Sequence, residues 1–450
     1  MLSIKQVLKA TNGILLNGDD NTKIKSYKID SREINKNDFF IPIKGKKVDS
    51  HIYLDKVVLL GVIGFFLEET FYDKNKDYID KIIKENNSIN IIIVKDTLKA
   101  LYEIGKYNRS LHMDIPVIAV TGSVGKTSTK EMISSIFEKE YKVLKTYKNF
   151  NGYIGLSLML LMLDDQDIAV LEHGIDVIGE MKLLAQASKP TYSVITNIGM
   201  SHIENFETKE NIAKEKLIIS DYTEKEVFIN GEDDLLSRCN GERYVKYYLN
   251  EIKDINQKEN ITKYKTKIYN KFTDIIINEY GKHNIYNSLV AIKIAEKFNI
   301  KVEKIIKGIG EYKNFSKRFE VKGLSSGKII IDDTYNASYD SFKSGLESLE
   351  NFKKKIIVVL GDILETGKYA EQLHTNVGKL FSYIKVEEVI TYGDNSKYIN
   401  KEASKYVCAK QFDTKEEIIK YLNDKKEKGL LIYFKASNGM KFSDIVEKID

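Results

Sequence analysis

The feature that most constrains the fold is a short glycine-containing loop between an apolar strand and a helix. Residues 117–132 read VIAVTGSVGKTSTKEM. The apolar run Val117–Val120 predicts a buried strand, and the segment after the loop has the apolar spacing of a helix. In such a unit, glycines let backbone N–H groups turn toward an anion, and the first turn of the helix adds partial positive charge. The sequence therefore predicts a phosphate-binding loop that holds a nucleoside triphosphate.

Individual residues of this loop have separate expected roles. Gly122 and Gly125 have no Cβ, so the backbone of the loop can adopt the conformations that turn its N–H groups toward a phosphate. Lys126 would place a cation on the β- and γ-phosphates, and Thr127 would offer a hydroxyl to Mg²⁺. The strict pattern has glycine where this chain has Val120, so the loop is a shortened variant. The predicted ATP-binding segment comprises Thr121, Gly122, Ser123, Val124, Gly125, Lys126, Thr127 and Ser128.

Polar residues also stand where further apolar runs end. Glu172 and Asn197 each follow such a run directly, and His202 comes shortly after Asn197. Asp333 ends another run in the last third of the chain. Open α/β sheets bind ligands at the carboxyl ends of their strands, and Mg²⁺ prefers oxygen ligands. A strand-end carboxylate near a phosphate loop therefore indicates a magnesium site. The loop alone leaves the reaction open, because switches, motors, kinases and ligases share it.

The order of predicted elements indicates an α/β protein of three domains. A length of 450 residues gives about three domains as a prior. We expect a small mixed α/β domain over residues 1–112, a central parallel sheet of the P-loop ATPase type over 113–316, and a Rossmann-like domain over 317–450. Strands are predicted at 39–43, 91–94, 117–120, 168–171, 192–196, 328–331, 356–360, 388–391 and 430–434, and helices at 97–108, 179–188, 211–221, 339–349, 371–381 and 415–423.

Composition excludes several classes of protein. The formal charge of +5 comes from 70 basic and 65 acidic residues without a long basic block, so nucleic acid is not an expected partner. The longest apolar run, Val57–Leu67, is about half of a membrane span, and the N-terminus lacks the apolar core of a signal peptide. Cys239 and Cys408 lie far apart and match no metal-ligand spacing. We expect a cytoplasmic protein, with nothing that demands more than a monomer.

Ordered blocks along nearly the whole chain resemble the Mur ligase family. The phosphate loop is similar to that family's ATP loop almost letter for letter, and the segment 281–287 resembles its adenine-binding segment. The blocks that carry the resemblance are IDSREI (29–34), PIKGKKVDSH (42–51), TGSVGKTSTKEM (121–132), ITNIGMSHIENFETKENIAKEK (195–216), GKHNIYN (281–287), RFEV (318–321), IDDTYNASYDS (331–341), VLGDILETGKYAEQLH (359–374) and FKASNGMKF (434–442).

The resemblance implies a metal site and a catalytic set. Thr127, Glu172 and His202 would bind Mg²⁺. Lys216 matches the lysine that family members carry as a carbamate, which turns a cation into an oxygen donor for a second Mg²⁺. Lys126, His202 and Lys216 would accordingly be the catalytic residues.

The resemblance also implies nucleotide and substrate contacts. Asn284 and Asn287 would contact the adenine and its neighbourhood, Arg318 the nucleotide, and Asp333 the ribose. The expected substrate-binding residues are Ser31, Arg32 and His51, which match the part that grips a uridine diphosphate, and Asn151, in the segment after the ATP loop.

The implied activity is ATP-dependent amide-bond formation through an acyl phosphate. The resemblance points to the branch that adds D-alanyl-D-alanine to a UDP-muramoyl tripeptide during peptidoglycan precursor synthesis, with ATP and Mg²⁺ as cofactors. Departures from the family pattern, at Gly152, Tyr153, Asp176 and Asn438, leave room for a relative that joins a different amine or dipeptide. A nucleotide-dependent binding protein without ligation and a folate-type glutamate ligase are further alternatives. The sequence does not distinguish lysine from diaminopimelate in the peptide.

Overall fold

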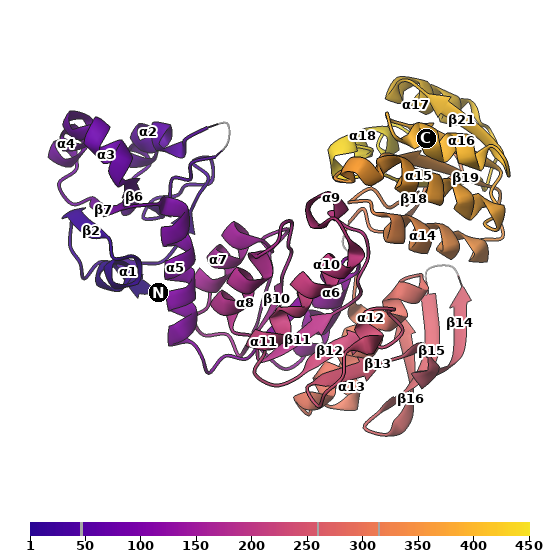
Figure 1. The fold of residues 1–450 in the computed structure, drawn as a ribbon, viewed down its shortest axis with the longest axis horizontal. Coiled ribbons are helices and arrows are strands. Elements are labelled where there is room, and N and C mark those ends of the chain that lie inside the picture. The colour runs from indigo at the N-terminus through magenta and orange to yellow at the C-terminus, as the bar shows by residue number, and fades with distance from the viewer. Residues whose placement is uncertain (46–47, 259–260, 314–315) are drawn as a thin grey trace.

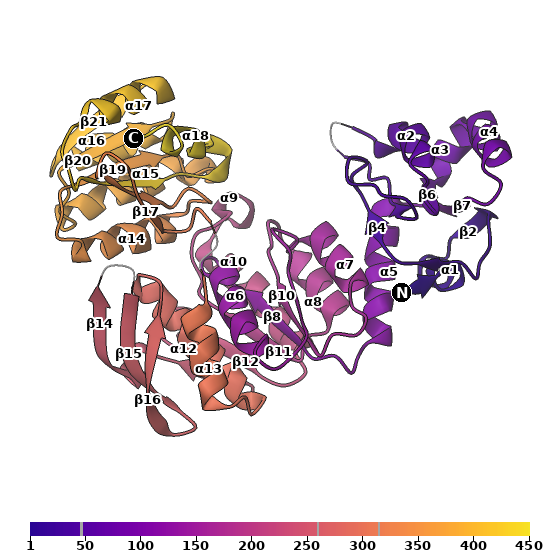
Figure 2. The same cartoon turned by 180° about the vertical axis from the view of Figure 1, so that it is seen from behind.

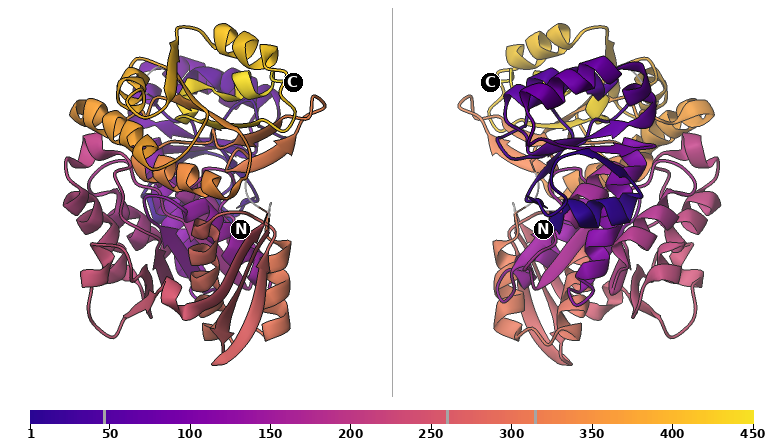
Figure 3. Two further views of the ribbon diagram at one scale, coloured as in Figure 1. Left: turned by 90° about the vertical axis from the view of Figure 1, so that its right-hand side faces the viewer. Right: turned by 90° about the vertical axis from the view of Figure 1, so that its left-hand side faces the viewer.

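Three mainly parallel β-sheets form the centres of three lobes (Figure 1). The computed structural model describes residues 1–45, 48–258, 261–313 and 316–450. The first and third lobes stand at opposite ends of the central one when the molecule is seen from the front or from behind (Figures 1 and 2). The two end-on views show the first and third lobes on the same side of the central lobe (Figure 3). The mixed α/β fold class predicted from the sequence is confirmed.

The first lobe contains a five-stranded sheet in the order β2-β7-β6-β5-β4, in which only β2 runs antiparallel to its neighbour. The predicted strand at 39–43 is shorter than expected, because Pro42 lacks the N–H that would continue the ladder. The elements are β1 Leu2–Ser3, α1 Ile4–Thr11, β2 Ile14–Asn17, β3 Lys23–Ile24, β4 Tyr27–Lys28, β5 Phe39–Phe40, α2 Leu54–Leu59, β6 Gly64–Glu68, α3 Glu69–Lys74, α4 Lys76–Glu85, β7 Asn90–Val94 and α5 Thr97–Leu111.

Helix α5 fastens the first lobe to the central one. Its Asn108 amide, buried, donates to the carbonyls of Leu160 and Leu163 at the end of α7, 2.8 and 2.9 Å away. Its Tyr102 ring stacks on Tyr153 with the centroids 4.9 Å apart. Buried amide hydrogen bonds satisfy the carbonyls that a helix end leaves unpaired, so this junction is a packed interface.

The central lobe has a six-stranded parallel sheet in the order β13-β12-β11-β8-β10-β9. The pairing sets Glu172 of β10 opposite Val120 of β8 and Ile195 of β11 opposite Thr121, so the three strands end side by side. The elements are β8 Val117–Thr121, α6 Lys126–Phe137, β9 Val143–Lys145, α7 Tyr153–Leu161, β10 Ile168–Glu172, α8 Glu180–Ser188, β11 Tyr192–Ile195, α9 Ile203–Phe206, α10 Lys209–Leu217, α11 Ile219–Tyr222, β12 Val227–Asn230 and β13 Tyr244–Tyr247.

The single helix predicted over 211–221 is wrong, because the structure divides it into α10 and α11. The Ile218 N–H donates to the Glu215 carbonyl three residues back, at 3.2 Å. Such a tightened turn commonly ends an α-helix, and a new short helix starts after it.

A three-stranded antiparallel sheet and two helices complete the central region. In β15 the burial alternates residue by residue, so one face packs against α12 and the other faces solvent. The elements are β14 Ile252–Lys258, β15 Ile261–Ile268, β16 Lys271–Ile277, α12 Lys282–Lys297 and α13 Val302–Glu311.

The third lobe has a six-stranded sheet in the order β17-β18-β22-β19-β20-β21, parallel except at the β17 edge. The strands predicted in this part of the chain all occur within one or two residues of their expected ends. The elements are β17 Glu320–Gly323, β18 Ile329–Asp332, α14 Tyr339–Ser348, β19 Ile356–Gly361, α15 Ala370–Lys379, β20 Glu388–Tyr392, α16 Ser396–Ala403, β21 Cys408–Phe412, α17 Lys415–Asp424, β22 Leu431–Lys435 and α18 Ser443–Val446.

Candidate active site

A cavity of about 870 Å³ lies between the phosphate loop of the central lobe and the third lobe. It unites residues that are far apart in the sequence, because the strand ends of both sheets face it. Of the residues predicted from the sequence, those that line the cavity are Ser123, Val124, Gly125, Lys126, Thr127, Ser128, Asn151, Glu172, His202, Asn287, Arg318 and Asp333. Thr121, Gly122, Lys216, Asn284, Ser31, Arg32 and His51 are not among the lining residues.

The phosphate loop has the backbone that its glycines suggested. Gly122 has a φ of +143°, and a Cβ placed there would stand 1.9 Å from Thr196 Oγ1. Thr196 Oγ1 and Asn197 Nδ2 both donate to the Val124 carbonyl, at 2.6 and 2.9 Å. The strand-end residues of β11 therefore clamp the loop, and only glycine fits between them.

Lys126 closes the loop on itself. Its ammonium donates to the carbonyls of Gly122 and Ser123, at 2.8 and 3.3 Å. Burial lowers the pKa of Lys126, and the nearby Glu172 carboxylate acts in the opposite direction. The loop carbonyls hold the cation at the mouth of the loop, where a phosphate would meet it.

Thr127 and Glu172 form a pair of oxygen donors beside the loop. Thr127 Oγ1 donates to Glu172 Oε2 at 2.9 Å and accepts a hydrogen bond from Arg318 of the third lobe at 3.1 Å. Asn151 Nδ2 donates to the other carboxylate oxygen of Glu172 at 2.8 Å. The side chains of Thr127 and Glu172 are buried. A carboxylate and a hydroxyl held together in this way fit Mg²⁺.

The described residues do not enclose a metal ion by themselves. Within residues 1–45, 48–258, 261–313 and 316–450, no group of three or more His, Cys, Asp and Glu side chains could hold a metal ion. The donor set of Thr127 and Glu172 therefore fits an ion that takes its remaining ligands from phosphate oxygens or water, as Mg²⁺ commonly does.

His202 lies on the other side of the cavity, immediately before α9. Its Nε2 is 3.5 Å from Asp176 Oδ1, and its Nδ1 is 2.5 Å from Glu365 Oε2 of the third lobe. Glu365 was not among the predicted site residues, because its neighbour in space comes from another lobe. His202 is thus held between two carboxylates at the junction of the lobes.

Lys216 of α10 is a buried lysine whose ammonium makes no ion pair or hydrogen bond within the part of the chain that the structure describes. Burial lowers its pKa well below the usual value, and the charge of Lys126 lowers it further. Asp176 and Glu215 act in the opposite direction. A depressed pKa favours the neutral amine over the ammonium, and lysines of this kind are more typical of functional sites than of purely structural positions.

Helix α12 brings two asparagines toward the loop. Asn287 Oδ1 accepts from Thr129 Oγ1 at 2.9 Å, and Asn287 Nδ2 is buried with no partner within the described residues. Asn284 donates to the Tyr280 carbonyl at 2.8 Å, and its Oδ1 is likewise buried and unpartnered there. Unsatisfied buried amides are costly, so a ligand that offers an acceptor to Asn287, which lines the cavity, would be favoured, whereas Asn284 is fully buried and does not line it.

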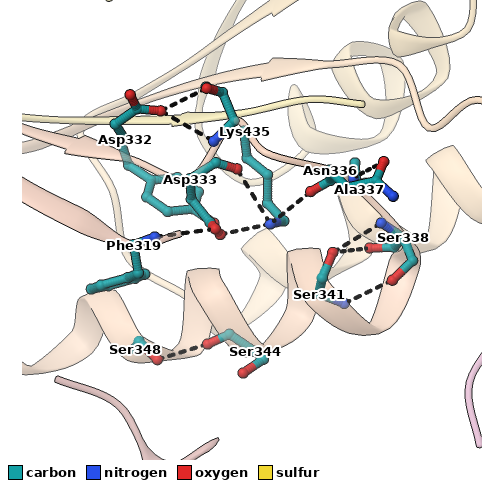
Figure 4. A network of polar contacts seen from close by, with 12 residues as sticks. Phe319, Asp332, Asp333, Asn336, Ala337, Ser338, Ser341, Ser344, Ser348 and Lys435 are labelled. Carbon is teal, nitrogen blue, oxygen red and sulfur yellow. Dashed lines mark hydrogen bonds and ion pairs between the residues drawn. The ribbon is translucent and has the colours of Figure 1, made fainter. Parts of the chain in front are cut away.

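Asp333 is the centre of a polar network in the third lobe (Figure 4). Lys435 and Tyr433 donate to its Oδ2 at 2.6 and 2.8 Å, and the Phe319 N–H donates to its Oδ1 at 3.3 Å. Burial lowers the pKa of Lys435, which is 2% exposed. Sequence reasoning missed Lys435 and Tyr433. The one sequence signal for this pair was the position of Lys435 at the end of the otherwise apolar strand β22.

The three residues predicted to grip a uridine diphosphate lie in the first lobe. Ser31 is buried, and Arg32 is highly exposed and forms a two-pronged ion pair with Asp30, which lowers the pKa of that carboxyl to about 2. His51 is buried: Asp49 contacts its Nδ1 at 2.6 Å and the Glu68 N–H donates to its Nε2 at 3.2 Å. Both ring nitrogens of His51 are engaged, so it orders the loop around it. Of the neighbouring block 42–51, residues 46 and 47 lie outside the described part.

The positions at which the sequence departs from the family pattern line the same cavity: Gly152, Tyr153, Asp176 and Asn438. These departures therefore concern residues that face the cavity. Nowhere in the described ranges is a helix both long and apolar enough to cross a lipid bilayer.

Comparisons with known proteins identify the family. The family model described as the Mur ligase middle domain matches residues 120–295, and the one described as "Mur ligase, glutamate ligase domain" matches residues 317–438. A UDP-N-acetylmuramoyl-tripeptide–D-alanyl-D-alanine ligase of Bacillus subtilis is 35% identical over 99% of this chain and 98% of its own length. The ligase of the same name from Haemophilus influenzae is 28% identical over 99% of this chain and 97% of its own.

Solved structures share the fold. A crystal structure of MurF from Acinetobacter baumannii has a TM-score of 0.89 at 24% identity, covering 99% of this chain and 98% of that one. MurF ligase from Thermotoga maritima in complex with ADP has a TM-score of 0.81 at 24% identity, covering 94% of this chain and 96% of that one. The family matches and the full-length relatives confirm the resemblance inferred from the sequence, and the chain belongs to the Mur ligase family of ATP-dependent ligases.

Proposed function

We propose that this enzyme adds D-alanyl-D-alanine to UDP-N-acetylmuramoyl-tripeptide, at the expense of ATP, in peptidoglycan precursor synthesis. The full-length similarity to the B. subtilis ligase of that name carries the proposal. The cavity supports it, because the phosphate loop, the Glu172 carboxylate and residues of the third lobe line one space. We assign the reaction to the cytoplasm and the enzyme to a monomer, with domain boundaries near residues 112 and 316.

The chemistry begins with a carboxylate, which is a poor electrophile at neutral pH. Its oxygen attacks the γ-phosphorus of ATP, and ADP leaves as an acyl phosphate forms. The amine of the dipeptide then attacks the acyl carbon, and phosphate leaves with the former carboxylate oxygen. The loop N–H groups and the Lys126 ammonium stabilise the charge that develops on the transferring phosphoryl group.

Residues of both lobes hold the nucleotide in this proposal. Thr127 and Glu172 would hold a Mg²⁺ ion together with phosphate oxygens, and Mg²⁺ supplies charge neutralisation between the two anions when bound. Asn287 offers its unpartnered amide group to the adenine region, and Asn284, fully buried on the same helix, is assigned to that region by the family resemblance alone. Arg318 reaches from the third lobe to Thr127, and Asp333, held by Lys435, would accept from the ribose hydroxyls.

Lys216 is proposed to become a carbamate. Its neutral amine would attack CO₂, so that a C–N bond forms and one proton is released to water. The product is an anionic oxygen donor in place of a cation, which suits a second Mg²⁺ near His202. The depressed pKa and the burial of Lys216 support this assignment, since a protonated amine cannot react in this way.

The test supplies ATP, Mg²⁺, D-alanyl-D-alanine and UDP-muramoyl tripeptides that contain either lysine or diaminopimelate. We expect one ADP for each pentapeptide product, measured by coupled absorbance and mass spectrometry. Other amines and dipeptides are then offered at fixed UDP-substrate, which tests what Gly152, Tyr153, Asp176 and Asn438 select. Folded protein that makes ADP at the same slow rate with and without the tripeptide would refute ligation, and preference for another amine would refute the dipeptide.

A further inference from the structure

The third lobe contacts the central lobe at the short α9 segment, beside His202. Tyr369, in a 3₁₀ turn at Gly367–Tyr369, donates its hydroxyl hydrogen to the Glu207 carbonyl at 2.6 Å. A Cβ at Gly367 would stand 2.9 Å from Glu204 Cγ, so the two segments are in close contact. Further along the same junction, Asp340 accepts a hydrogen bond from the Met200 N–H at 2.9 Å. This junction is the setting of the Glu365–His202 contact.

The backbone at this contact is unusual on both sides. His202 and Glu365 have φ values of 57° and 58°, in the left-handed region that non-glycine residues seldom adopt. Each such conformation costs energy, and an exposed ion pair returns little stability. The Glu365 side chain is 61% exposed, so the gain in stability from the pair does not explain the strained backbone. Backbone strain of this kind is concentrated at functional sites.

The ion pair with Glu365 restrains the His202 ring electrostatically, and among the described residues Nδ1 has no partner with hydrogen-bond geometry. Glu365 lies at Nδ1, whereas Nε2 points toward Asp176, which lines the cavity. A histidine that binds a metal through one ring nitrogen commonly has a carboxylate at the other, which sets its tautomer and raises its basicity. Here that carboxylate comes from a different lobe than the histidine does.

We propose that Glu365 is a positioning residue that holds His202 in its metal-binding orientation only while the third lobe is docked, so that metal binding and lobe docking are coupled. The inference rests on the proposed metal site at His202. Because such a coupling is reciprocal, a metal ion bound at His202 would in turn favour the docked arrangement. The site would then be complete only when the third lobe covers the phosphate loop, which limits loss of the acyl phosphate to water.

The test counts bound Mn²⁺ from the electron paramagnetic resonance signal of the free ion, on the full chain with ADP present. E365Q should weaken one class of Mn²⁺ site by about tenfold or more, the usual effect of removing such a carboxylate. The matched control E371Q removes an exposed carboxylate at the start of α15 and should bind as the wild type does. Y369F, which loses only the hydrogen bond to Glu207, should weaken the same class less than E365Q does.

A second measurement reads docking directly. Spin labels on Cys239 and Cys408, the two native cysteines, report the distance between the central and third lobes. Mg²⁺ with ADP should narrow the distance distribution in the wild type and not in E365Q. Unchanged or tighter Mn²⁺ binding in E365Q, or equal narrowing, would overturn the coupling while leaving the metal site in place. If H202A binds as many Mn²⁺ ions as the wild type, both the metal assignment and the inference fail.

Discussion

Replacing Lys435 by methionine tests the polar network that builds the third-lobe side of the site. Lys435 is 2% exposed and its ammonium lies 2.6 Å from Asp333 Oδ2. Methionine has nearly the same length and no charge, so the substitution removes the cation without opening a large space. The Asp333 carboxylate keeps the Tyr433 hydroxyl and the Phe319 N–H as donors but loses the ammonium that pairs with it (Figure 4).

Breaking a buried ion pair from one side typically costs about 3–5 kcal/mol. We expect the lower end, about 3 kcal/mol, because the Asp333 side chain is 15% exposed and retains two donors. The suitable assay is hydrogen exchange followed by mass spectrometry, since a chain of three lobes need not unfold in one step. Peptides covering β18 and β22 should exchange about 150-fold faster in the variant if exchange follows the opening equilibrium.

The double variant D333N/K435M decides whether the lost pairing is the cause. It removes the stranded charge, so its exchange in β18 and β22 should be at least about tenfold slower than in K435M. Exchange in K435M within about threefold of the wild type, or a double variant as fast as K435M, would refute the reasoning from the ion pair.

Three further predictions concern the rest of the site and the core. G122A should abolish nucleotide binding measured by calorimetry, because its Cβ would overlap Thr196 Oγ1. The control G323A places its Cβ in open space and should bind ATP normally. Nucleotide binding by G122A would contradict the loop geometry. K216A should lose ligation activity and retain ADP binding. A ¹³C carbamate signal from labelled bicarbonate should be absent in K216A and present in the control K214A, which removes an exposed lysine of the same helix. Equal ligation activity in K216A and the wild type would dismiss the carbamate. Burial lowers the pKa of His173 to about 4, against 6.5 for a free histidine, so the folded state binds fewer protons than the unfolded state between these pH values. The free energy of unfolding should therefore fall by about 3 kcal/mol as the pH drops from 6.5 to 4. A histidine NMR titration that gives a pKa near 6.5 for His173 would contradict this.

The sequence predicted the loop and three of the six strands of the central parallel sheet, β8, β10 and β11, and missed β9, β12 and β13. Strands such as β8, β10 and β19 are apolar runs bounded by polar residues, and that pattern is local. The antiparallel strand β14 was not predicted, because its residues Ile252–Lys258 are mostly polar and show no long apolar run. Local patterns identify buried strands better than they identify strands with an exposed face.

The candidate site was predictable only where one lobe defines it. Lys126 and Thr127 follow from the loop pattern, and Glu172 follows from its place at a strand end. The partners of His202 and Asp333 could not be predicted, because Glu365 and Lys435 come close to them only after the chain has folded. The burial of Lys216 also depends on tertiary packing, since by itself it is one more lysine on a helix.

The most direct test of the account follows the oxygen atoms. UDP-muramoyl tripeptide labelled with ¹⁸O in its terminal carboxylate is turned over with ATP and D-alanyl-D-alanine, and the released phosphate is analysed by mass spectrometry. An acyl phosphate requires that each phosphate carry one ¹⁸O, because the bond that breaks lies between that oxygen and the acyl carbon. Unlabelled phosphate formed together with the amide product would contradict the central claim.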